Sequence, residues 1–165
     1  MPTPFLWYDD QAEGASNFYV SVFSARPGSG DRGPSKVLAV TRYGEAGPGT
    51  TGSVMTVSFV LDGQEFVALN GGRQGFSFNE SVSFVVHCEN QDEVDHFWDA
   101  LTEGGEPGPC GWLKDRFGLS WQIVPRELNE LVSDPDPERA RRAMEAMLEM
   151  GKIEVEALRQ AADAA

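Results

Sequence analysis

Histidine and cysteine are scarce in this chain, which holds only two of each among 165 residues. His87 and Cys88 are adjacent on a predicted strand and therefore point to opposite faces, while His96 lies off the apolar stripe of a predicted helix. No pair has the spacing of metal ligands, and Cys110 with His87 is the single thiol–imidazole combination to consider. The composition thus disfavours a metal site and a Cys–His catalytic pair, and we expect two free thiols.

Basic residues and long apolar runs are also few. The chain has 13 Lys and Arg against 26 Asp and Glu, a net charge of −13, so no basic face can neutralise a nucleic acid or an anionic membrane. No apolar run approaches the roughly 20 residues that span a bilayer. Residues 1–4 lack the features of a signal peptide. We predict a cytoplasmic single domain over residues 1–165, with no nucleic-acid and no membrane partner.

The sequence contains a weak internal repeat of a strand followed by a helix. A strand predicted at residues 3–8 leads into a helix that reaches about residue 23. A second strand, at residues 82–86, leads into a helix that Gly104 and Gly105 end. An offset of 79 positions superimposes the apolar residues of the two units: Ala15 on Val94, Phe18 on Phe97, Tyr19 on Trp98, Val22 on Leu101, and Phe5 on Phe84.

Strands follow each helix in both halves. After the first helix the pattern predicts strands at 36–43, 53–61 and 65–70, the last two joined by an Asp62-Gly63 hairpin turn. The second half is shorter, with an extended stretch at 112–116 and a strand at 119–125. Each half reads β-α-β-β-β. We therefore predict an α+β fold of two βαβββ modules, about residues 2–72 and 80–126, around a shared cleft.

A helical tail is predicted at about residues 134–163. Asp136 is a suitable N-cap residue and Pro137 suits the first helical position, where its missing N–H has no cost. Gly151 interrupts an apolar stripe that resumes from residue 152. The stripe carries three methionines, which adapt well to contact surfaces: Met144, Met147 and Met150. It lies either against a partner subunit, which we favour slightly, or on the chain's own sheet.

Two segments carry a specific resemblance: residues 110–125, CGWLKDRFGLSWQIVP, and residues 133–140, SDPDPERA. Together with the repeat, they resemble the PhnB-like branch of the vicinal oxygen chelate superfamily, which includes glyoxalase, extradiol dioxygenases and bleomycin- or fosfomycin-resistance proteins. The resemblance covers nearly the whole chain. It implies an incomplete barrel around a cleft, a small-molecule ligand of unidentified nature and a homodimer. Many members of the branch carry the label 3-demethylubiquinone-9 3-methyltransferase.

The residues do not support that methyltransferase label. A typical S-adenosylmethionine site needs a strand, a glycine-rich loop and a helix that opens directly after the loop. The glycines at 28–33 follow a helix instead of a strand. Gly71 and Gly72 do follow a strand, but residues 73–79 have no helical stripe. The residues therefore disfavour methyltransferase activity.

The metal-ligand positions of the superfamily's active members can be compared with the residues that this sequence has there. These members place ligands in the first and last strands of each module, and the resemblance puts those positions at Pro4, Ala68, Ser83 and Gln122. The first two have no side-chain donor, Ser83 is a poor neutral ligand, and Gln122 alone makes no site. We predict no metal and no cofactor. The alternative is a metal-dependent lyase, isomerase or dioxygenase of the superfamily with ligands one residue away.

The remaining candidates are side chains expected on the concave face of the cleft, and no catalytic residue is assigned. They are Trp7, Asn70, Ser83, Trp112, Lys114, Asp115 and Gln122. Trp121 and Gln122 alternate on their strand, so only one of them lines the cleft; the resemblance favours Gln122, with Trp121 in the core. Lys114 and Asp115 precede a turn and can equally be solvated or stabilise it. We predict metal-independent small-molecule binding; a purely structural protein with a dimer surface is the third hypothesis.

Overall fold

The structure is a computed structural model that describes residues 1–164. It divides into two compact units, Met1–Ser77 and the chain from Phe78 onward, and each is described by itself. No helix among the described residues is long and apolar enough to cross a bilayer.

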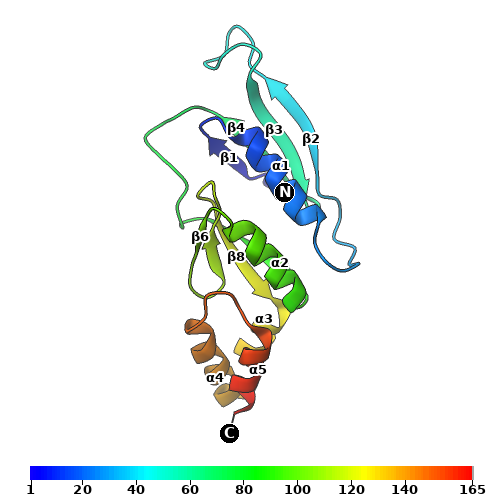
Figure 1. Ribbon diagram of the computed structural model, residues 1–165, viewed down its shortest axis with the longest axis vertical. Helices are drawn as coiled ribbons and strands as arrows, with labels where there is room; N and C mark the ends of the chain where they lie inside the picture. The colour runs from blue at the N-terminus through cyan, green and yellow to red at the C-terminus, as the bar shows by residue number, and fades with distance from the viewer. Residues whose placement is uncertain (165) are drawn as a thin grey trace. The chain divides into compact units, whose positions relative to one another are not determined.

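The first unit is a four-stranded sheet with one helix across its face (Figure 1). The strand order is β1-β4-β3-β2, with β1 parallel to β4 and the other neighbours antiparallel. The elements are β1 (Phe5–Tyr8), α1 (Ala12–Ser24), β2 (Lys36–Arg42), β3 (Val54–Leu61) and β4 (Gln64–Asn70). Asp62 and Gly63 both have positive φ, 48° and 81°, which is the conformation of the predicted two-residue hairpin turn.

The second unit repeats this topology with three shorter strands and one longer strand. Its order is β5-β8-β7-β6, again with the outer pair β5 and β8 parallel. The elements are β5 (Ser83–Cys88), α2 (Gln91–Thr102), β6 (Glu106–Pro107), β7 (Trp112–Lys114) and β8 (Ser120–Pro125). The identical order of corresponding strands confirms the repeat and the βαβββ modules. Gly104, with φ 75°, follows the end of α2 as predicted.

Each helix packs its apolar stripe onto its own sheet. The two stripes superimpose at the predicted offset, and their paired positions are buried: Ala15 and Val94 are both 0% exposed. Tyr19 and Trp98 occupy the next matching place, at 0% and 9%. Trp121, 2% exposed, lies in the core of the second unit as predicted. The cysteines are free thiols, Cys88 buried and Cys110 partly buried.

The strands do not follow the offset that the helices follow. Tyr8 and Cys88 are the buried last residues of β1 and β5, at 2% and 1% exposure, and they correspond at an offset of 80. Phe5, 60% exposed, therefore corresponds to Val85 and not to Phe84, so that pairing was wrong. The cause is the connection between strand and helix, which is residues 9–11 in the first unit and only residues 89 and 90 in the second.

The tail folds onto the second unit. Helices α3 (Arg126–Val132), α4 (Pro137–Leu148) and α5 (Val155–Asp163) share a small core. Asp136 caps α4 by accepting from the Glu138 N–H at 3.0 Å, and Pro137 occupies the first position, as predicted. Met147 and Met150 are partly buried against this core, whereas Met144 is 40% exposed; contact of the stripe with a partner subunit stays a prediction. The α5 helix begins three residues later than expected.

Gly14 offers a test of the α1 helix. The Gly14→Ala variant is expected to stabilise the protein by about 0.5 kcal/mol, because a Cβ there meets nothing within 4 Å and alanine loses less backbone entropy in a helix. Gly72→Ala is the matched control: it also has open space, but its φ of 78° makes alanine unfavourable by about 1 kcal/mol. Urea unfolding measures both. Equal effects of the two substitutions would contradict this assignment.

Candidate functional site

Helix α2 packs on one face of the second sheet, and alternation along the strands decides which side chains lie on the other face. Leu113, Trp121 and Val86 are buried on the side of α2. Their neighbours in sequence therefore point to the opposite side, which we call the open face. In the ladder, Gln122 lies opposite both Val85 and Trp112. The open face comprises Ser83, Val85, His87, Glu106, Trp112, Lys114, Ser120 and Gln122. Val124, at the end of β8, is covered by the core of the tail helices.

Two of the predicted site residues bond to each other on this face. Gln122 Nε2 donates to Ser83 Oγ at 2.9 Å, between the adjacent strands β8 and β5. Both side chains are partly buried. The prediction that Gln122, and not Trp121, lies on the open side agrees with the register.

A groove of about 450 Å³ opens beside this pair. Trp112 and Lys114 line it, together with Pro107 of β6 and Pro109 of the loop that precedes β7. Ser120 lies directly opposite Lys114 in the β7–β8 ladder and also lines the groove. Flat apolar side chains with a few converging polar groups are typical of small-molecule sites.

The charged groups of the groove centre on Lys114. It forms an ion pair with Glu80, which stands before β5, and lies opposite Glu106 in the β6–β7 ladder. The hydrogen bond with the Glu80 carboxylate raises the pKa of Lys114, and the same bond lowers the pKa of Glu80. The ammonium and carboxylate are therefore both charged at neutral pH. Their side chains are 37% and 59% exposed, so solvent screens the pair.

Ser120 is the least satisfied polar side chain of the groove. The residue is 1% exposed, and its Oγ is buried with no hydrogen-bond partner in the structure. Buried hydroxyls usually have a partner, because leaving one unpaired costs free energy. Ser120 was not predicted from the sequence, although its spacing of two from Gln122 on one strand places both on the same face.

Asp115 has a structural role that differs from its predicted place in the cleft. It is 3% exposed and lies on the buried side of the sheet. Its Oδ1 accepts from the N–H groups of Phe117 at 2.8 Å and Leu119 at 3.1 Å, and its Oδ2 accepts from Trp121 Nε1 at 2.9 Å. The carboxylate thus closes the turn before β8 and orients a core tryptophan, in line with the turn-stabilising alternative.

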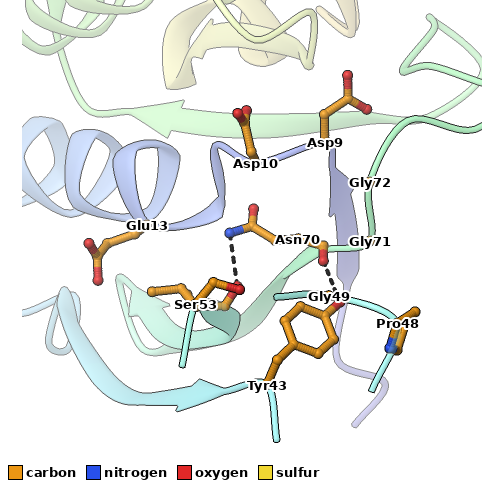
Figure 2. Close-up of a pocket in the computed structure, with 11 residues that line it drawn as sticks. Asp9, Asp10, Glu13, Tyr43, Pro48, Gly49, Ser53, Asn70, Gly71 and Gly72 are labelled. Carbon is orange, nitrogen blue, oxygen red and sulfur yellow. Dashed lines mark hydrogen bonds between the residues drawn. The ribbon is translucent and has the colours of Figure 1, made fainter. Parts of the chain in front are cut away.

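Asn70, the candidate from the first unit, also lies on the helix side. Its Oδ1 accepts from the Ala12 N–H at 2.8 Å, at the start of α1, and its Nδ2 donates to the Val54 carbonyl at 3.2 Å. Figure 2 shows Asn70 at the centre of a pocket of about 370 Å³, where its carbonyl accepts from the Tyr43 hydroxyl at 2.5 Å. The Asn70 side chain thus joins α1 to β3, and its backbone carbonyl holds the Tyr43 hydroxyl, so these polar groups have partners within the first unit.

Acidic side chains surround that pocket. Asp9, Asp10 and Glu13 line it (Figure 2), and Asp9 pairs with Arg73 at 3.5 Å. The polar side chains inside it, Asn70 and Tyr43, are bonded to the protein itself. This pocket therefore presents carboxylates at its rim and no converging group that awaits a ligand.

Trp7 lies on the exposed side of the first sheet, 37% exposed. Its Nε1 donates to the Gly72 carbonyl at 2.9 Å, and Phe76 contacts its ring edge-on with centroids 5.3 Å apart. A Cβ at Gly71 would stand 2.2 Å from the indole, so glycine allows the chain to cross close to it. The segment after β4 thus packs against Trp7.

The metal-ligand positions of the superfamily hold no suitable donor set here. The offset of 80 between the strands moves both positions in the first unit by one residue, from Pro4 to Thr3 and from Ala68 to Val67. Val67 lies opposite Phe5 as Gln122 lies opposite Val85, and threonine offers only a neutral hydroxyl. Valine ligates no better than alanine. In the second unit Ser83 supplies a neutral hydroxyl and Gln122 a neutral amide, and these two side chains are hydrogen-bonded to each other. Among residues 1–164, no three His, Cys, Asp or Glu come together as metal ligands. The side chains do not fit a divalent ion.

Two successive βαβββ units define the fold of the vicinal oxygen chelate superfamily, and solved structures share it. A putative 3-demethylubiquinone-9 3-methyltransferase, PhnB protein, from Bacillus cereus is 32% identical with a TM-score of 0.63, over 75% of this chain and 98% of that one. Protein PA1353 from Pseudomonas aeruginosa is 18% identical with a TM-score of 0.58, over 76% and 96%.

The fosfomycin resistance protein FosX from Listeria monocytogenes, whose structure is described as complexed with Mn(II) and sulfate ion, shares the fold at 15% identity. Its TM-score is 0.52, over 79% of this chain and 94% of that one. No curated protein matches the chain. The family model described as 3-demethylubiquinone-9 3-methyltransferase matches residues 2–124, and the chain belongs to this family. The helical tail lies almost entirely beyond the match.

Proposed function

We propose that this protein binds a small molecule in the groove on the open face of the second sheet, and does so without a resident metal ion. The observation that carries the proposal is the convergence of Trp112, Lys114 and the buried, unpartnered Ser120 hydroxyl on one groove of about 450 Å³. The family's fold supports it, because the superfamily includes small-molecule enzymes and resistance proteins. The donor set at the metal positions supports binding without a metal.

The methyltransferase in the family's description is not part of the proposal. The glycines at 28–33 lie between α1 and β2, and Gly71 and Gly72 follow β4 but lead into residues 73–82, which form no helix. Neither segment presents a helix N-terminus to a cofactor. The homodimer and the cytoplasmic location expected from the sequence stay predictions.

A fragment titration tests the location of the site. Protein treated with EDTA is titrated with planar aromatic fragments, and backbone and indole ¹⁵N shifts are recorded by NMR. We expect the largest shifts at Trp112, Lys114 and Ser120. The Trp112→Ala variant is expected to weaken binding about tenfold, because the fragment loses its flat apolar wall.

Phe76→Ala is the control, since Phe76 is an aromatic residue of the first unit, 61% exposed, and lies outside the groove. It is expected to leave the affinity unchanged. Shifts confined to the pocket around Asn70, or fragment binding that survives Trp112→Ala intact, would place the site elsewhere and overturn the proposal.

A further inference from the structure

We infer that the ligand of this groove is a planar ring that carries a carboxylate, and that Glu80 is an internal competitor for it. The inference rests on the proposed function and names its ligand class. Its basis is the chemistry of the polar groups that line the groove beside the Trp112 ring: an ammonium, a hydroxyl and two carboxylates, those of Lys114, Ser120, Glu80 and Glu106.

Lys114 and Ser120 both favour an oxygen acceptor. An ammonium has three N–H donors and no acceptor, and a serine hydroxyl can donate one hydrogen bond. The two residues are direct neighbours across the β7–β8 ladder, where side chains on one face stand about 5 Å apart at Cβ. A carboxylate has two oxygens and can accept from both groups at once. It would also give the buried Ser120 Oγ the partner that it lacks.

Glu80 occupies the place that this carboxylate would take. Its side chain pairs with Lys114 yet stays 59% exposed, in a turn before β5 and outside any strand or helix. An exposed ion pair of this kind contributes little stability, so its exchange for a ligand carboxylate is cheap. Glu106 stays opposite Lys114, and the groove without Glu80 would hold one ammonium and one carboxylate.

The rest of the groove is built for a flat apolar group. Trp112 supplies an aromatic face, and Pro107 and Pro109 are rigid apolar residues that also line the groove. Aromatic rings pack favourably against such surfaces in offset or edge-on arrangements. A ring on Trp112 would bring an attached carboxylate toward Lys114, because the two residues lie on the same face of β7, two positions apart.

The experiment compares 2-naphthoate with its neutral isostere 2-naphthamide by isothermal titration against the full chain and its variants. For wild type we expect the acid to bind at least about tenfold more tightly than the amide. Lys114→Met is expected to remove that preference. Ser120→Ala is expected to lower the affinity for the acid severalfold. Glu80→Gln is expected to raise the affinity for the acid about threefold and to leave the affinity for the amide unchanged, because only the competing charge is removed. Lys36→Met, on the edge strand β2 of the first unit, is the control and should change nothing.

The outcomes separate this inference from the proposed function. Equal affinities for acid and amide in wild type and in Lys114→Met overturn the carboxylate inference but keep a ring-binding groove. A looser complex of the acid with Glu80→Gln overturns the competitor role. If neither probe binds wild type or Glu80→Gln, while circular dichroism shows both folded, the ligand class and the groove itself are both wrong.

Discussion

Replacement of Asp115 by alanine is expected to lower the free energy of unfolding by about 3–5 kcal/mol. The carboxylate is buried and accepts from two backbone N–H groups of the turn and from the indole of Trp121. Alanine removes all three acceptor contacts at once and leaves the Leu119 N–H and Trp121 Nε1 buried without them. Hydrogen bonds to a charged acceptor are the stronger kind, and buried donors left unpaired add a desolvation cost.

Urea unfolding followed by tryptophan fluorescence measures this loss. Asp115→Asn keeps one acceptor oxygen but places an NH₂ group, itself a donor, opposite one of the donors. This variant should lose about half as much free energy of unfolding. Asp31→Ala, an exposed aspartate in the loop between α1 and β2, is the control and should stay within about 0.5 kcal/mol of wild type. A loss below about 1 kcal/mol for Asp115→Ala would show that the turn does not depend on this carboxylate.

The Gly105→Ala substitution is expected to cost about 3 kcal/mol or more. A Cβ at residue 105 would stand 2.1 Å from the Lys114 carbonyl oxygen and 2.7 Å from the Asp115 carbonyl carbon. Both obstacles are backbone, so no side-chain rotation relieves the clash, and β6 must separate from β7. Because Glu106 and Lys114 pair in that ladder, the groove should lose its ligand affinity together with stability.

Gly75→Ala is the matched control, because its Cβ meets nothing within 4 Å. Thermal unfolding by circular dichroism should show a lower Tm for Gly105→Ala and an unchanged one for Gly75→Ala. Equal melting temperatures would contradict the close approach of Gly105, the residue ahead of β6, to β7.

Local patterns predicted the parts of the fold that local chemistry determines. The spacing of Ala15, Tyr19 and Val22 identified one helix face, and Asp62-Gly63 identified a hairpin, because each depends on residues a few positions apart. The α3 helix was not predicted, because Leu128 and Leu131 form an apolar stripe too short to distinguish a helix from a loop. The strand β6 was not predicted either, because it has only two residues.

The site was harder to predict because it depends on register and on partners distant in sequence. The connection between β5 and α2 is one residue shorter than the connection between β1 and α1. The strands of the two units therefore correspond at an offset one residue larger than the helices do, and the apolar pattern does not reveal this difference. Asp115 and Asn70 are polar residues beside turns, and only the fold shows that their side chains are used by backbone and indole donors. Alternation did predict that Gln122 and Trp121 lie on opposite faces of β8, and Trp121 is buried. The roles of Trp112, Lys114, Ser83 and Gln122 in ligand binding stay predictions.

Binding without a metal ion is the central claim, and the indole N–H resonance of Trp112 tests it most directly. The protein is titrated with 2-naphthoate twice, once in excess EDTA and once after addition of Mn²⁺. We predict the same saturable shift of the Trp112 indole signal and the same Kd in both titrations, because no donor set at the open face fits a divalent ion. A shift that appears only with Mn²⁺ and disappears in EDTA would contradict the account.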